Sequence, residues 1–211
     1  MKNAERKQRL QTALIAAAER AVAAHGLAGL KARSLAAEAG CAVGAIYNVV
    51  ADLDDLALAV HARTLAALEK QLTTSAAKVP VEACAGPQRA VGQLIQMAIA
   101  YLEFAAANKA RWRALFEGRV PEGKPMPEWY RAEQTRLFGY IEQPLRDLLP
   151  SMPPDQLATL ARSLFSAVHG IVTLGLEEKL GTVSLEELRN QTTLIVSAIA
   201  MGLLAPGKAV L

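Results

Sequence analysis

Residues 30–56 read LKARSLAAEAGCAVGAIYNVVADLDDL, and their pattern predicts two short helices joined by a tight turn. A run of good helix formers from Arg33 to Ala39 predicts the first helix. Gly40 follows it, where a left-handed residue would end a helix. The stretch from Val43 to Val49 is long enough for a second short helix. The pattern is that of a helix-turn-helix.

The small and apolar residues of this stretch fall where two crossed helices touch. Ala36 has almost no side chain, so the second helix can approach the first closely. The residues that we expect in the small shared core are Leu35, Ala39, Ile46 and Val49. The residues left facing outward are Val43, Gly44, Ala45, Tyr47 and Asn48. In a helix-turn-helix, outward residues near the start of the second helix face base edges in the major groove. We therefore expect this face to read double-stranded DNA.

These residues resemble the TetR family of bacterial transcriptional regulators. The matching frame is G-x-x-x-x-x-x-R-x-L-A-x-x-A-G-x-x-x-G-x-I-Y, from Gly26 to Tyr47, and the resemblance covers about the first quarter of the chain. It implies that Tyr47 contacts a phosphate and that Arg33 contacts a phosphate or a base. Lys31 and Ser34 are further candidate DNA contacts beside Arg33.

A few positions depart from the family's pattern. The family often has Ser or Thr capping the second and third helices, whereas this chain has Lys31, Ala32 and Ala42. Side-chain caps and their phosphate contacts are therefore missing there, and Ser34 is the alternative cap. Leu53 stands where the family often has a lysine opening the next helix, which removes one more phosphate contact.

The basic residues gather at the N-terminus. Residues 1–33 hold seven Lys and Arg against two Glu, whereas residues 34–60 hold four acidic residues and no Lys or Arg. The basic arm and first helix are placed to reach the DNA backbone or the minor groove. A solvated charged tail is the alternative. The whole chain has a net charge of +3, which permits a nucleic-acid partner without demanding one.

Composition predicts an all-α protein. The 211 residues are 52% hydrophobic and rich in Ala and Leu, only 5% are aromatic, and no long run alternates apolar and polar β-branched residues. We expect an N-terminal three-helix helix-turn-helix domain over residues 1–60. A helical ligand-binding and dimerisation domain would follow over residues 61–211. Asp52 and Ser184 are predicted to cap the helices that follow them.

Six aromatic residues flank a break rich in Pro and Gly between Arg119 and Pro127. They and one histidine are candidates to line a pocket for a small apolar or aromatic ligand. The seven candidates are Tyr101, Trp112, Phe116, Trp129, Tyr130, Phe138 and His169. The alternative is ordinary core, and for His169 we favour a hydrogen-bonded core or interface residue.

The last two predicted helices, Asp155 to Leu180 and Leu185 to Ala205, are apolar on more than one face. Such helices need more than their own protomer to cover them, so we expect a homodimer through a two-fold four-helix interface. The TetR family dimerises in this way. The segment SAVHGIVTL, Ser166 to Leu174, is similar to the W-H-G segment of one branch of its C-terminal domains.

Neither a catalytic nor a metal site can be assembled from the sequence. The three histidines lie in different contexts, the two cysteines lie far apart, and the usual nucleophile, Walker and dinucleotide motifs are missing. We expect no cofactor. Met1 to Gln11 is charged and polar, unlike a signal peptide, and the longest uncharged run is interrupted by polar residues and Pro206. We expect a cytoplasmic protein with no membrane partner.

These observations favour a ligand-responsive DNA-binding transcriptional regulator that binds a palindromic operator as a dimer. Because repression is usual in the TetR family, we expect a repressor. Two alternatives stay open. The first is a helical small-molecule binder with a vestigial DNA-binding head, which predicts no sequence-selective, salt-dependent DNA binding. The second is a helical enzyme, which predicts turnover of a ligand and its loss when His169 or Tyr130 is changed.

Overall fold

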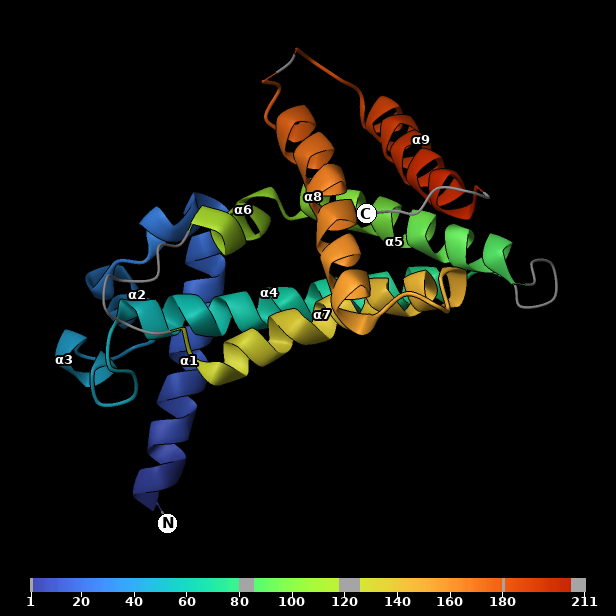
Figure 1. Cartoon of the computed structure of the whole chain (residues 1–211). Helices are drawn as coiled ribbons and strands as arrows, with labels where there is room; N and C mark the ends of the chain where they lie inside the picture. The colour runs from blue at the N-terminus through green and yellow to red at the C-terminus, as the bar shows by residue number, and fades with distance from the viewer. Residues whose placement is uncertain (1, 80–85, 118–125, 180, 206–211) are drawn as a thin grey trace. The chain divides into compact units, whose positions relative to one another are not determined.

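The computed structural model describes residues 2–79, 86–117, 126–179 and 181–205. Within these ranges the regular elements are helices (Figure 1), apart from one isolated bridge between Lys179 and Gly181. The predicted all-α class is therefore confirmed. Most of the predicted break at residues 119–127 lies outside the described residues. The chain divides into two compact units, of which the first is Met1–Ala67 with Ala107–Arg131 and the second is Leu68–Ala106 with Ala132–Leu211.

The first unit begins with a long helix followed by the predicted pair of short ones. Its elements in chain order are α1 (Lys2–His25), the 3₁₀ helix η1 (Gly26–Gly29), α2 (Ala32–Glu38), α3 (Val43–Ile46), the start of α4 (Leu53–Ala76), α6 (Lys109–Glu117) and the start of α7 (Glu128–Leu148). Gly26 at φ +62° ends α1, and Gly40 at φ +68° follows α2. Both glycines have the left-handed backbone that was predicted for Gly40 and that other residues adopt at a cost.

The core of the first unit joins α1 to the helix-turn-helix. Leu35 and Ile46 are completely buried and Ala36 is 2% exposed, while Ala39 and Val49 pack partly buried against them, as predicted. The other members of this core are Leu14, Ala17, Ala18, Val22, Leu56, Val60 and Ala114. Ala114 lies on α6, so a helix distant in the sequence completes the core beneath the helix-turn-helix.

The helix α3 is shorter than predicted. It ends at Ile46 rather than Val49, and the amides of Val49 and Val50 both donate to the Ile46 carbonyl at 3.0 and 3.1 Å. Two β-branched valines in succession disfavour another helical turn. Tyr47 is the C-cap residue, so Tyr47 and Asn48 stand on a turn and not on the helix.

Two of the three predicted caps are confirmed. Asp52 accepts a hydrogen bond from the Asp55 amide at 3.0 Å at the start of α4, and Ser184 accepts one from the Glu187 amide at 3.1 Å. Ser34 is not a cap: Lys31 is the N-cap residue of α2, without a side-chain bond, and Ser34 lies inside the helix. The short α2 therefore depends on packing of Leu35 more than on a polar cap.

The second unit consists of the end of α4, α5 (Pro87–Ala107), most of α7, α8 (Pro154–Leu176) and α9 (Leu185–Leu204). The helix α8 ends four residues before the predicted Leu180, near Glu178, which has a left-handed φ of 55°. In Figure 1, α8 and α9 lie side by side, and residues of the two helices are in contact. Leu188 of α9 packs directly against Gly175 of α8.

Polar contacts tie the helices of the second unit together. Glu69 near the end of α4 accepts hydrogen bonds from Arg136 and Tyr140 of α7, both at 2.6 Å. Arg189 of α9 pairs with Glu103 of α5 at 3.0 Å. The helix α7 continues through a buried Pro144 to Leu148. One carboxylate of α4, that of Glu69, thus accepts from two donors of α7.

The packing units do not coincide with a single cut at residue 60. The first unit also contains α6 and the beginning of α7, while α4 runs through both units. The predicted domain boundary between residues 60 and 61 stays a prediction. By length and composition alone, α5 and α8 could each span a membrane, with 50% and 28% of the tested windows buried. Apolar core helices of soluble proteins share these properties.

Candidate functional site

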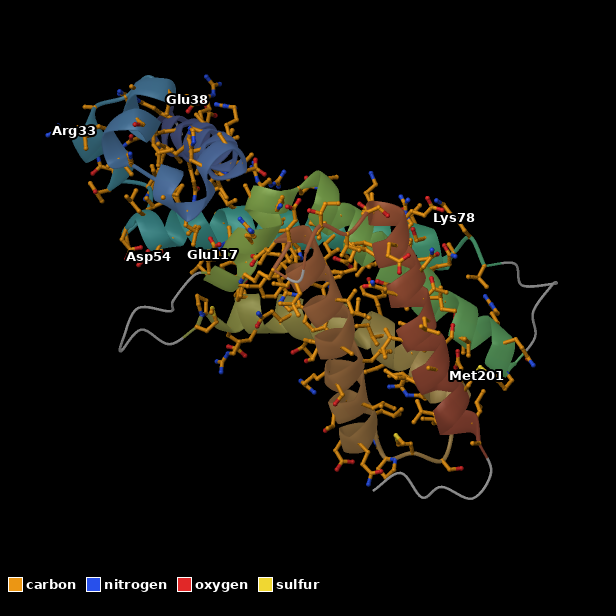
Figure 2. All side chains as sticks on the ribbon, turned by 90° about the horizontal axis from the view of Figure 1, so that it is seen from above. Arg33, Glu38, Asp54, Lys78, Glu117 and Met201 are labelled. Atoms are coloured by element: carbon orange, nitrogen blue, oxygen red, sulfur yellow. The ribbon has the colours of Figure 1, made fainter. Side chains whose placement is uncertain are left out.

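The eight candidate DNA contacts all lie in the first unit. Seven of them are exposed, and Ala45 is partly buried. Val43 is 39% exposed and Tyr47 is 51% exposed, although Ile46 between them is completely buried. Figure 2 shows Arg33 reaching away from α2 toward solvent. The structure thus presents Arg33, Val43 and Tyr47 outward on the two short helices and their following turn.

Ion pairs join α1 to α2, α4 and α6 within the first unit. Arg20 of α1 pairs with Glu38 of α2 at 2.5 Å. Glu19 of α1 pairs with Arg63 of α4 and lies 3.4 Å from Arg111 of α6. Sequence reasoning did not find these pairs, because their members are separated by 18 to 92 residues along the chain. They are partly exposed, so we expect each to contribute about 0.2–1 kcal/mol.

His61 of α4 is a buried titratable group in the first unit. Its side chain is 6% exposed, its ring is hydrogen-bonded to the Ala114 carbonyl, and its ring centroid lies 6.2 Å from that of Tyr130. Within the described part of the chain its Nε2 atom is buried without a hydrogen-bond partner. Burial lowers the pKa of His61 and raises the pKa of Tyr130, so both side chains are neutral near pH 7.

The seven candidate ligand residues fall into both units. Trp112, Phe116, Trp129 and Tyr130 belong to the first unit, where Trp112 is 1% exposed and its ring packs edge-on against Phe116 at 5.7 Å. Trp129 is 47% exposed and packs edge-on against Tyr130. Trp112 and Tyr130 are thus buried, while Phe116 and Trp129 present apolar surface.

The other three candidates gather in the second unit. The Tyr101 hydroxyl lies 2.7 Å from His169 Nδ1, and the Thr173 hydroxyl lies 3.2 Å from His169 Nε2. Both ring nitrogens of His169 therefore have a protein partner. Burial lowers the pKa of His169, so the ring is neutral near pH 7. One ring nitrogen donates and the other accepts, with a hydroxyl completing each bond.

Phe165 joins this cluster and was missed from the sequence. Its ring centroid lies 5.4 Å from that of His169 and 5.5 Å from those of both Tyr101 and Phe138. It stands one helical turn before His169, and this spacing was the available signal. The Arg162 guanidinium lies over the Phe138 ring, 5.3 Å from its centroid, and makes a cation–π contact with it.

Apolar side chains are exposed along α8 and α9. Leu194 and Met201 of α9 are 70% and 69% exposed, one stands two turns after the other, and Figure 2 marks Met201 on this helix. Further exposed apolar residues of the two helices are Leu174, Leu185 and Leu204. In the described ranges, no group of three His, Cys, Asp or Glu side chains is placed to hold a metal ion.

Comparisons with known proteins agree with this architecture. Residues 94–195 match the family described as the tetracyclin repressor-like C-terminal domain. A search of curated proteins finds no match. Among solved structures, a protein with unknown function from Rhodococcus sp. RHA1 is similar with a TM-score of 0.72 and 20% identity, covering 93% of this chain and 96% of that one.

Two similar structures are described as regulators. A TetR-family transcriptional regulator from Bordetella parapertussis has a TM-score of 0.56 and 18% identity, covering 88% of this chain and 93% of that one. The TetR family transcriptional regulator PfmR from Thermus thermophilus has a TM-score of 0.58 and 14% identity, covering 87% of this chain and 96% of that one. At these identities the likeness establishes the fold.

Proposed function

We propose that this chain, whose residues 94–195 match the tetracyclin repressor-like C-terminal domain, is a ligand-responsive transcriptional regulator of the TetR family that binds DNA through its helix-turn-helix. In the proposed complex it acts as a homodimer on a palindromic operator and represses the genes beside it. The observation that carries the proposal is the exposed face formed by Arg33, Val43, Tyr47 and Asn48, held above a core in which Ile46 and Leu35 are completely buried.

The chemistry of this face suits DNA. Lys31 and Arg33 supply positive charge at the start of α2, the Tyr47 hydroxyl can donate to a phosphate, and the Asn48 amide can pair with a base edge. Val43 supplies an apolar contact for a thymine methyl group. Phosphate contacts fix the position of the protein on the duplex and base contacts give selectivity.

Dimerisation through α8 and α9 supplies the second DNA-reading head. Leu194 and Met201 would lose most of their large exposed areas in such an interface. Burial of apolar area is worth about 25 cal/mol per Å². The 28% burial of the apolar window in α8 also favours a partner on this helix. To enter successive major grooves, the two heads of such a dimer must lie roughly 34–36 Å apart, which is one turn of DNA.

Regulation would come from a small apolar or aromatic ligand in the C-terminal domain. The cluster of Tyr101, Phe138, Phe165 and His169 supplies apolar ring surface beside polar atoms in the second unit. We propose this cluster of the second unit as the wall of the ligand pocket. A ligand that prefers a dimer with its heads differently spaced would weaken operator binding.

Fluorescence anisotropy with a labelled duplex of mixed sequence tests the DNA-binding step. We expect binding that weakens steeply between about 50 and 200 mM salt, because phosphate contacts release counterions. Tyr47→Phe should weaken binding to all sequences by about threefold to tenfold, since only the hydroxyl is lost. Tyr140→Phe, which removes a hydroxyl from the second unit, is the control. Absence of salt-dependent binding would contradict the proposal.

One alternative has an observation in its favour. The helix α3 has only four residues, the N-cap residues Lys31 and Ala42 make no side-chain cap, and three aspartates open α4 nearby. These features favour a small-molecule binder whose DNA-binding head is vestigial. That protein would bind a ligand in the second unit and show equal, negligible DNA binding in wild type and Tyr47→Phe.

A further inference from the structure

The first unit contains a groove of about 670 Å³ for which the proposed function gives no ligand. It is lined by α1, by the turn after α3, by the start of α4 and by residues 127–129. A volume of this size lies within the range of small-molecule sites, which is about 300–1,000 Å³. All of its lining residues belong to the first unit, so the groove does not depend on how the two units are placed.

Apolar and polar surfaces are separated in this groove. Ile15 of α1 with Leu58 and Ala62 of α4 supply partly buried aliphatic surface. Two aromatic side chains stand at the groove with large exposed areas, Tyr47 at 51% and Trp129 at 47%. Exposed aromatic rings beside aliphatic surface are typical of sites that take a flat apolar body.

The groove is lined by one basic side chain, Lys7, and one acidic side chain, Asp55. Among the described residues Lys7 makes no ion pair, and it follows Arg6 on the basic arm. The groove's acidic residue, Asp55, is already engaged: its Oδ2 accepts the Ala51 amide at 2.8 Å. Asp55 also lies in the first turn of α4, where the free N–H groups stabilise a carboxylate. Lys7 is therefore the charge that is left to recognise a ligand.

We propose that this groove binds a small aromatic carboxylate, with its ring against Trp129 and the aliphatic surface and its carboxylate beside Lys7. The site lies in the first unit, apart from the ligand cluster of the second unit that the proposed function uses. Because Tyr47 and Asn48 line the groove, a bound ligand covers two of the residues proposed to contact DNA. Such a ligand would compete with DNA directly, without any change in the spacing of a dimer.

Titration with 2-naphthoate, followed by NMR of the tryptophan indole N–H signals, tests this site. The chain has two tryptophans, Trp129 in the groove and Trp112 in the core, and Trp129→Phe assigns their signals. We expect the Trp129 signal to move with a Kd of roughly 1 mM, as for a ligand of this size, while the Trp112 signal stays in place. The neutral isostere 2-naphthamide should bind several-fold more weakly.

Two variants make the test specific. Lys7→Gln should weaken 2-naphthoate about fivefold and leave 2-naphthamide unchanged, which is the scale of one exposed charge pair. Lys70→Gln, an exposed lysine outside the groove, is the matched control. Ala62→Leu should fill the groove and abolish both shifts, and Ala59→Leu repeats this test at a neighbouring position.

Several results would overturn the proposal. They are an unmoved Trp129 signal, equal affinity for 2-naphthoate and 2-naphthamide, and an unchanged affinity in Lys7→Gln. The titration contains no DNA, so its failure leaves the proposed DNA binding intact. Conversely, loss of DNA binding in the anisotropy experiment leaves this ligand site intact.

Discussion

The Tyr101 hydroxyl and His169 Nδ1 lie 2.7 Å apart and join α5 to α8 in the second unit. The bond holds the imidazole among the Phe165 and Tyr101 rings. His169 is therefore a hydrogen-bonded residue between packed helices. The sequence favours a hydrogen-bonded core or interface residue at this position. A role of His169 in ligand binding stays a prediction.

Tyr101→Phe should lower the free energy of unfolding by about 1 kcal/mol, because a partly buried nitrogen of His169 loses its partner. For a protein of this size the melting temperature should fall by roughly 2–4 °C. Thermal unfolding followed by circular dichroism measures this change. Thr173→Val, which removes the longer 3.2 Å contact to Nε2, should have the smaller effect. Equal stability of Tyr101→Phe and wild type would refute the energetic role of the bond.

Stability should fall as the pH is lowered below about 6.5, the ordinary pKa of histidine. The folded-state pKa values of His61 and His169 are both lowered by burial, so the unfolded chain binds protons first. Their contribution is fully present above about pH 6.5 and is lost as the pH falls through the lowered folded pKa values. Urea unfolding at a series of pH values from neutral to mildly acidic measures the loss.

A histidine variant identifies the source of this loss. His61→Asn keeps an N–H donor near the Ala114 carbonyl and removes the titrating ring, so its stability should depend less on pH than that of wild type. The exposed His25 at the end of α1 supplies the control variant, His25→Asn. If His61→Asn and wild type lost stability in parallel, burial of His61 would not cause the dependence.

Gly175→Ala should destabilise the pairing of α8 with α9. A methyl group at Gly175 would overlap the Leu188 side chain, so the two helices must separate or Leu188 must leave its rotamer. We expect a loss of about 1–3 kcal/mol in chemical unfolding. At Gly139 of α7 an added methyl meets no atom within 4 Å, so Gly139→Ala should instead gain about 0.5–1 kcal/mol. Two variants of equal stability would contradict the close packing.

Met201→Glu should weaken the proposed dimer. Met201 is 69% exposed on α9, so a glutamate is tolerated in the protomer and becomes costly only when a partner covers it. Sedimentation velocity should show a shift toward monomer that grows on dilution, and Leu194→Glu should do the same. Ala132→Glu, at an exposed position of α7, is the control. A dimer that persists unchanged in both α9 variants would place the interface elsewhere.

Local signals predicted most of the helical framework. Gly40 predicted the end of α2, and Asp52 and Ser184 predicted the starts of α4 and α9. Helix ending by glycine and helix capping by a side chain both act within a few residues of the chain. The shared core of Leu35 and Ile46 also followed from local spacing. The end of α3 was placed three residues late, because the turn after Ile46 closes with bonds that spacing alone does not reveal.

Contacts between distant segments escaped prediction. The sequence gives no local sign that Ala114 completes the core of the first unit, that Glu19 meets Arg111, or that Phe165 joins Tyr101. The groove beside Lys7 was missed for the same reason, since its wall comes from four separate segments. Such arrangements follow from tertiary packing, which overrides local propensity.

Selection of bound sites from a random duplex library, at two salt concentrations, tests the proposed regulator most directly. We predict an enriched palindrome whose half-sites are centred about 10 bp, or a multiple of it, apart. Asn48→Ala should relax base preference at one position in each half-site without changing the spacing. A library that shows no enriched motif, with weak binding that vanishes as salt is raised, would contradict sequence-selective DNA binding by this protein.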